Sequence, residues 1–103
     1  MANRNTTSEA LIEKCLVEEV KAAGGWCLKL PAVFESGIPD RVCLFPFARV
    51  VFVELKAPGK KPRRLQEIMH SRLRALGFRV EVIDSRERAK ALAQEYGGEC
   101  NKM

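Results

Sequence analysis

The stretch RVVFVELK, residues 49 to 56, constrains the fold more than any other part of the chain. Its continuous apolar run is typical of a central strand that is covered on both faces of a sheet. Strand side chains alternate between faces, so Glu54 shares a face with Phe52 and Val50, and Lys56 points the same way. A buried charge is costly unless it is paired or bound to a metal. The run therefore predicts either an internal Glu54–Lys56 ion pair or a functional site at the end of this strand.

The rest of the chain predicts a helix, three strands, a helix, a strand and a helix. Helices are expected at about 9–23, 62–76 and 86–96, and strands at 26–30, 41–46, 49–56 and 78–84. The passage from 49 to 84 can form a right-handed parallel crossover. We therefore predict a single α/β domain over residues 1–103, a central mixed β-sheet flanked by helices, with a core at about 8–96 and loose ends at 1–7 and 97–103.

The charge of the chain favours a polyanionic partner. The net charge is +5, and Lys60, Lys61, Arg63 and Arg64 fall within one short loop that follows the apolar run. A solvated loop is the alternative reading of that cluster. No stretch reaches the roughly 20 apolar residues that span a membrane, and the first residues lack the apolar core of a signal peptide. We expect a cytoplasmic protein.

The remaining special residues indicate ordinary structural roles. The four cysteines form no CxxC pair and the chain has a single histidine, so we expect reduced thiols rather than a zinc site. We expect His70 on the surface, and Trp26 and the phenylalanines in the core.

Further acidic residues stand where carboxylates are unusual. Asp40 directly precedes the strand that neighbours Glu54, although a turn aspartate is the simpler reading. In the first helix, Glu9 and Glu13 lie in or beside the apolar stripe that should pack on the sheet, and Glu9 could instead favour the helix N-terminus. Hard cations such as Mg²⁺ bind through one or two carboxylates plus waters and phosphate oxygens. Convergence of these acids with Lys56 would create such a site.

Three segments resemble the VRR-NUC family of the PD-(D/E)xK nuclease superfamily. They are GIPDRV, RVVFVELKAPGKKPRRLQ and LRALGFRVEVIDS, with the motif residues at Pro39-Asp40 and Glu54-Leu55-Lys56. The resemblance covers residues 9 to about 92 and is to the small stand-alone form found in phages and prophages. It implies a restriction-endonuclease-like fold.

The resemblance implies a role for each matched residue of the central motif. Asp40 and Glu54 match the metal-binding acids, and Lys56 matches the catalytic lysine. A backbone carbonyl of Val53 or Leu55 would complete the metal ligands, and Leu55 is preferred because the peptide after Glu54 lies nearest.

The resemblance also implies three supporting roles outside the central motif. The first-helix glutamate of the superfamily falls best on Glu13, with Glu9 as the alternative. Gln66 matches a glutamine near the active site, although it could merely cap its helix interface. Lys29 matches a basic position that contacts phosphate.

These expectations combine into one leading function and three alternatives. We expect a Mg²⁺- or Mn²⁺-dependent homodimeric endonuclease that cuts branched DNA, with four-way junctions as the preferred substrate, and whose 60–64 loop holds phosphates through salt-sensitive contacts. The alternatives are a flap or nicking nuclease, a non-catalytic nucleic-acid-binding subunit, and a structural protein whose charges are satisfied pairs.

Overall fold

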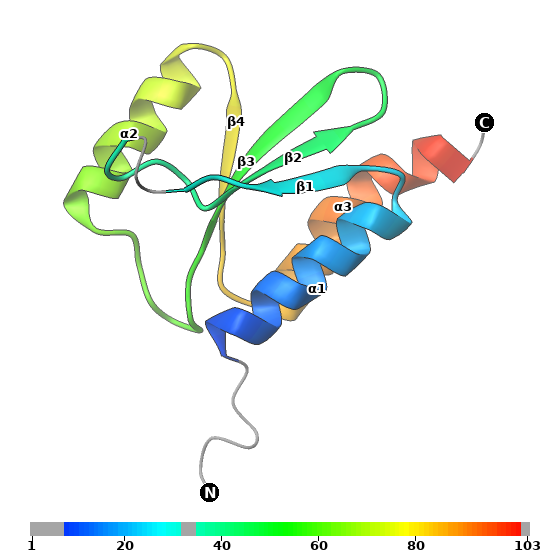
Figure 1. Ribbon diagram of the computed structural model, residues 1–103, viewed down its shortest axis with the longest axis horizontal. Helices are drawn as coiled ribbons and strands as arrows, with labels where there is room; N and C mark the ends of the chain where they lie inside the picture. The colour runs from blue at the N-terminus through cyan, green and yellow to red at the C-terminus, as the bar shows by residue number, and fades with distance from the viewer. Residues whose placement is uncertain (1–7, 32–34, 102–103) are drawn as a thin grey trace, which may run out of the picture.

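The computed structural model describes residues 8–31 and 35–101. The element order is the predicted one (Figure 1). The elements are α1 (Glu9–Ala22), β1 (Trp26–Lys29), β2 (Arg41–Phe45), β3 (Arg49–Leu55), α2 (Arg64–Ala75), β4 (Arg79–Ile83) and α3 (Arg86–Asn101).

The four strands form one mixed sheet in the order β1-β2-β3-β4. β1 pairs with β2 and β2 pairs with β3 in antiparallel fashion, whereas β3 and β4 are parallel. A parallel pair needs a crossover connection, and α2 supplies it between β3 and β4. The prediction of a central mixed sheet with β3 as an inner strand is confirmed.

One face of the sheet packs against α1 and α3, which lie side by side (Figure 1). Ser8 caps α1, because its Oγ accepts a hydrogen bond from the backbone N–H of Leu11 at 3.2 Å. The predicted apolar stripe of α1 is fully buried on the sheet. The core on this side contains Ile12, Leu16 and Val20 of α1, Val51, Val53 and Leu55 of β3, and Ala89, Leu92 and Ala93 of α3.

Helix α3 continues to Asn101, beyond the predicted end near Tyr96. Gly97 is buried where α3 meets the end of α1, and a Cβ added there would lie 3.0 Å from the Cβ of Ala23. A glycine pair usually indicates the end of a helix. Here close helix–helix packing explains why glycine stands inside one.

The opposite face of the sheet carries Val50, Phe52 and Glu54 and is covered only partly, by α2. His70 is the buried residue of this helix. Trp26, predicted to be in the core, is 65% exposed on the same face of the sheet, because α2 does not reach β1. The prediction was wrong for Phe47 and Phe78 as well, which are also exposed.

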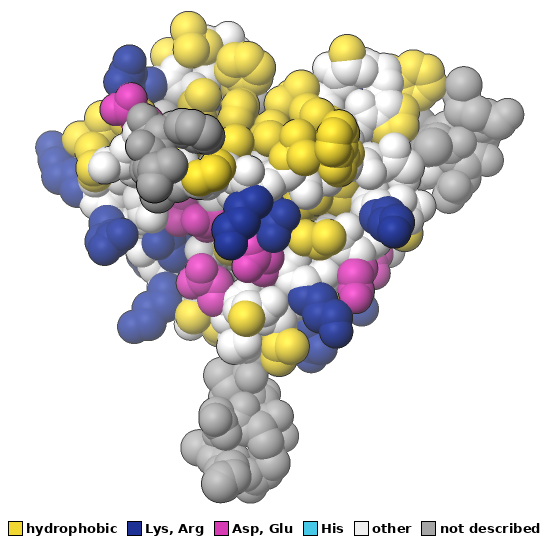
Figure 2. All heavy atoms as spheres, in the orientation of Figure 1, with side chains coloured by type: hydrophobic (Ala, Val, Ile, Leu, Met, Phe, Trp, Pro, Cys, Tyr) yellow, Lys and Arg dark blue, Asp and Glu magenta, His cyan; other side chains and the backbone are white. Residues whose placement is uncertain are grey.

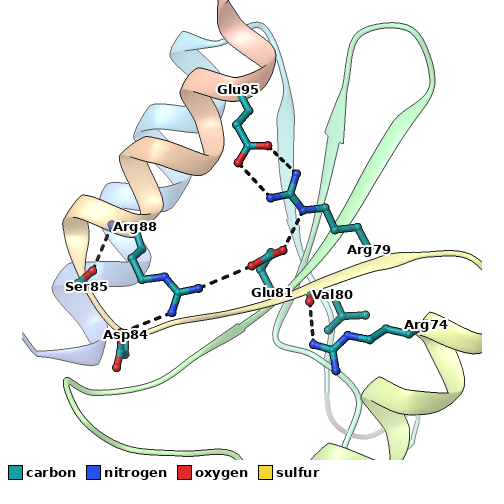
Figure 3. Close-up of polar contacts among 8 residues, drawn as sticks. All are labelled: Arg74, Arg79, Val80, Glu81, Asp84, Ser85, Arg88 and Glu95. Atoms are coloured by element: carbon teal, nitrogen blue, oxygen red, sulfur yellow. Dashed lines mark hydrogen bonds and ion pairs between the residues drawn. The ribbon is translucent and has the colours of Figure 1, made fainter.

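A polar network ties the edge strand β4 to α3 (Figure 3). The guanidinium of Arg79 donates to both carboxylate oxygens of Glu95 at 2.8 and 3.0 Å, and its Nε donates to Glu81 at 2.9 Å. Arg88 of α3 approaches the same Glu81 at 3.7 Å. The network holds β4, which pairs with β3, against α3.

The described cysteines carry free thiols, at Cys15, Cys27 and Cys43, and the side chain of Cys100 lies outside the described part. Cys27 and Cys43 face each other across β1 and β2 with their sulfur atoms 3.9 Å apart. Within the described residues, none of the helices has the length and apolar character needed to cross a membrane.

Candidate active site

Glu54 is the centre of a polar cluster between β3 and α2. It lies one residue before the end of β3, and its neighbours Val53 and Leu55 point to the opposite, apolar face. Glu54 is only 1% exposed. Burial, followed by the negative charge of Asp40, raises the pKa of Glu54 to about 7, and the nearby Lys56 opposes that rise. A carboxylate at this position is destabilised unless cations or hydrogen-bond donors surround it.

Asp40 lies beside Glu54 because of the register of β2 and β3. Arg41 pairs with Val53, so the residue before Arg41 continues the ladder next to Glu54. The Oδ2 atom of Asp40 accepts a hydrogen bond from the backbone N–H of Leu55 at 2.7 Å. The GIPD turn is therefore held directly against the end of β3.

Lys56 and Gln66 both contact the Oε2 atom of Glu54. The Lys56 ammonium lies 3.3 Å from it, and the Gln66 amide nitrogen donates to it at 2.9 Å. The other end of the same amide, Oε1 of Gln66, accepts from the backbone N–H of Arg63 at 2.8 Å. The Glu54–Lys56 pair expected from the strand alternation is thus present, and it forms part of a larger cluster with Asp40 and Gln66.

His70 is buried beside Glu54, so the expectation of a surface histidine was wrong. It is 1% exposed, and its Nε2 lies 3.6 Å from the Oε1 atom of Glu54. Neither of these two buried atoms has a hydrogen-bond partner in the described part of the chain. Burial lowers the pKa of His70, which favours the neutral ring. The spacing from Gln66 to His70 is one helical turn, and this was the sequence signal that could have placed both on one face.

The first helix presents its two acids differently. Glu13 forms an ion pair with Arg41, with its Oε2 at 2.8 Å from Nη2 and 3.0 Å from Nε. Glu9 is exposed, and its negative charge makes a small contribution to the raised pKa of Glu54, after the larger effects of burial and Asp40. The structure therefore brings Glu9 under the influence of the site and engages Glu13 elsewhere.

The oxygen donors of the cluster are suited to a hard cation. Among the described residues, no group of three or more His, Cys, Asp and Glu side chains has the geometry to hold a metal ion. Mg²⁺ sites often use only one or two carboxylates, with water and substrate oxygens completing the coordination. The carboxylates of Asp40 and Glu54 fit that smaller donor set.

The predicted DNA-binding residues are exposed cations. Lys60, Lys61 and Arg63 lie on the connection from β3 to α2, Arg64 begins α2, and Lys29 ends β1. None of the five joins an ion pair with another residue of 8–31 or 35–101. Figure 2 shows acidic side chains gathered near the middle of this face, with Lys and Arg side chains around them.

The comparisons with known proteins identify two informative relatives, whereas no family model matches the chain. A phage protein, "Putative nuclease p44" of Acyrthosiphon pisum secondary endosymbiont phage 1, is 44% identical over 84 residues, which cover 82% of this chain and 90% of that protein. A solved structure described as a "VRR_NUC domain" superposes with a TM-score of 0.78 at 33% identity, covering 87% of this chain and 98% of that one.

Proposed function

The chain belongs to the VRR-NUC family of nucleases, and from this premise we propose that it is a divalent-metal-dependent DNA endonuclease with a preference for branched substrates, four-way junctions above all. The observation that carries the proposal is the convergence of Asp40, Glu54, Lys56 and Gln66 at the end of β3. Two acids and a lysine on adjacent strand ends are the components of metal-assisted phosphodiester hydrolysis.

The proposed cation ligands are oxygen atoms of the cluster. They are the carboxylates of Asp40 and Glu54, the backbone carbonyl of Leu55, and Glu9 through water, while Glu13 stays with Arg41. Burial of Glu54 and the negative charge of Asp40 raise the free energy of the metal-free site, as the elevated pKa of Glu54 indicates. Bound Mg²⁺ or Mn²⁺ would polarise the scissile phosphate and lower the pKa of a coordinated water.

Lys56 and Gln66 act beside the cation. The Lys56 ammonium is held 3.3 Å from Glu54, where it can orient the attacking water or stabilise the negative charge that develops on phosphate. Gln66 keeps the Glu54 carboxylate in one orientation. The rigid, apolar opposite face of β3 holds all of these groups in register.

The exposed cations provide sequence-independent DNA contacts. Lys60, Lys61 and Arg63 lie on the loop that leads away from the site, Arg64 begins α2, and Lys29 ends β1. Contacts of this kind bind phosphates, weaken as salt rises and fix the register of the duplex without reading bases.

A homodimer would bring two such sites to one branched substrate. The sheet face beyond α2 offers apolar surface for a second copy, since Trp26 is 65% exposed there. Leu65 and Ile68 of α2 are also exposed, at 48% and 46%, so one subunit presents both an open sheet and an apolar helix side. If this face forms the dimer, Trp26→Lys will give a folded monomer by light scattering.

The proposal is tested by cleavage of labelled four-way junction, flap and linear duplex DNA by wild type and Lys56→Ala. Each reaction is run with Mg²⁺, Mn²⁺ or EDTA, and Lys90→Ala on α3 is the matched lysine control. We expect wild type and the Lys90→Ala control to cut, and Lys56→Ala not to cut. Cleavage should require Mg²⁺ or Mn²⁺, and the junction should be cut by paired symmetric nicks. Preferential cleavage of the flap DNA would support the nuclease assignment but replace the four-way junction as the preferred substrate.

A non-catalytic DNA-binding module is the second candidate, and the exposed basic loop favours it equally. It predicts metal-independent binding that leaves every DNA intact and is insensitive to Lys56→Ala. That result would reject the nuclease proposal.

A further inference from the structure

The arrangement of Glu54 leaves one of its two oxygen atoms facing His70. Lys56 and Gln66 both approach Oε2, whereas Oε1 has no hydrogen-bond partner among the described residues. The Nε2 atom of His70 is likewise unpartnered and lies 3.6 Å from Oε1. Both residues are 1% exposed, so bulk water does not satisfy either atom.

Two facing polar atoms in a buried site are costly unless they bond to each other or to a third group. A bridging water fits poorly, because two hydrogen bonds of about 2.8 Å spanning 3.6 Å would meet at roughly 80°. A small rotation of either side chain closes the direct hydrogen bond instead. The chemistry is complementary, since a carboxylate oxygen accepts and an imidazole Nε2–H donates.

We propose that His70 is a positioning residue of the active site, whose Nε2–H donates to Oε1 of Glu54 and, with Gln66 on Oε2, fixes the plane of that carboxylate. His70 and Gln66 are one turn apart on α2, so the helix holds both carboxylate oxygens from the same side. This inference rests on the proposed metal-dependent function for its consequence, but its geometry stands without a metal.

The first test measures Mn²⁺ binding to DNA-free protein by calorimetry for wild type, His70→Leu and His70→Gln. Glutamine places an amide donor near the position of Nε2, whereas leucine fills the space without a donor. Mutation of a residue that hydrogen-bonds to a metal-ligating side chain typically lowers metal affinity by about 10- to 100-fold. We expect at least a tenfold loss in His70→Leu and affinity within about threefold of wild type in His70→Gln.

Two results would overturn the assignment. Wild-type affinity in His70→Leu would show that Glu54 needs no help from His70. Equal losses in both variants would show that the imidazole acts through its shape and not through a hydrogen bond. Thermal melting of each variant in EDTA identifies a folding defect separately from a metal-binding defect.

The second test needs neither metal nor activity. The chain has one histidine, so the imidazole nitrogens of His70 give an unambiguous ¹H–¹⁵N spectrum once any purification tag is removed. We expect a proton on Nε2 in the metal-free protein, and a displaced Nε2 resonance with faster proton exchange in Glu54→Leu. A neutral ring protonated at Nδ1, or a spectrum unchanged by Glu54→Leu, would overturn the proposal.

The two tests separate this inference from the proposed function. If wild type fails to bind Mn²⁺, the metal-dependent function is rejected, and the spectrum still decides whether His70 donates to Glu54. If wild type binds Mn²⁺ and the spectrum shows Nδ1–H, the function survives and the role of His70 is rejected.

Discussion

The side-chain amide of Gln66 connects Glu54 to the start of α2. Its nitrogen donates to Oε2 of Glu54 at 2.9 Å, and its oxygen accepts from the backbone N–H of Arg63 at 2.8 Å. One residue therefore orients the carboxylate at the end of β3 and satisfies a free N–H group at a helix terminus. The Gln66 side chain therefore connects the two ends of the basic loop, which lies between β3 and α2.

Replacement of Gln66 will affect activity and stability together. Gln66→Ala removes both hydrogen bonds and is expected to lower the free energy of unfolding by about 1–3 kcal/mol and cleavage by about 10- to 100-fold. Gln66→Glu keeps the acceptor for Arg63 but places a second carboxylate against Glu54, so cleavage should fall at least as far. Gln94→Ala, at an exposed position of α3, is the control. Full activity in Gln66→Glu would contradict this role.

Lys56→Ala will separate binding from cleavage. The ammonium pairs with the buried carboxylate of Glu54, so its loss should destabilise the metal-free site but leave DNA affinity nearly unchanged. Single-turnover cleavage with Mn²⁺ should fall by about 10²- to 10⁴-fold, the range of a positioned proton-transfer group. Lys90→Ala on α3 should retain its cleavage rate. A comparable loss in both variants would indicate a general charge effect.

The raised pKa of Glu54 gives the metal-free protein a specific pH dependence. The pKa of Glu54 is about 7 in the folded state, compared with an ordinary value of 4.5, so the side chain stays protonated to a higher pH in the folded protein. Its contribution to stability is therefore complete below pH 4.5 and lost as the pH rises through 7, by up to about 3 kcal/mol. Glu54→Gln should match wild type at pH 4.5 and be more stable at pH 8, as measured by urea unfolding in EDTA.

Added Mn²⁺ provides the complementary observation for Glu54. At pH 8 the cation should raise the melting temperature of wild type and leave Glu54→Gln unchanged, because binding to the folded state alone is stabilising. If Glu54→Gln is less stable than wild type at pH 8 in EDTA, Glu54 is a structural ion-pair partner instead of a metal ligand.

The two acids of α1 will respond differently to neutralisation. Glu9→Gln should weaken Mn²⁺ binding, because the charge of Glu9 acts on Glu54. Glu13→Gln should leave Mn²⁺ affinity unchanged and cost up to about 1 kcal/mol of stability, since its partly exposed pair with Arg41 is lost. Calorimetric Mn²⁺ titrations and urea unfolding of both variants measure these effects. The reverse pattern would restore Glu13 as the helix carboxylate of the site.

The basic loop should dominate the salt dependence of DNA binding. Replacing Lys60, Lys61, Arg63 and Arg64 by Ala should lower the slope of log K against log salt by as much as about 3.6, if each neutralises one phosphate. The matched control replaces four exposed cations on the opposite helices, Lys14, Lys21, Arg86 and Lys90, and changes the net charge equally. Equal slopes in the two variants would assign DNA binding to net charge alone.

The sequence by itself determined the element order and the central motif. Strand alternation is a local property, so the apolar run of β3 was sufficient to place Glu54 on one face and to put Lys56 beside it. The GIP turn placed Asp40 at the start of the neighbouring strand for the same local reason. The resemblance to the family then assigned Gln66 to the vicinity, where it contacts Glu54.

Features that depend on how the helices pack on the sheet were decided only by the tertiary structure. The burial of His70 follows from the rotation of α2 on the sheet, and the pairing of Glu13 with Arg41 follows from the rotation of α1, neither of which helical periodicity fixes. The length of α3 depends on the fit of Gly97 against Ala23, a contact far apart in sequence. Local propensity specifies which face of an element is apolar, whereas packing selects which of the residues bordering that face are buried.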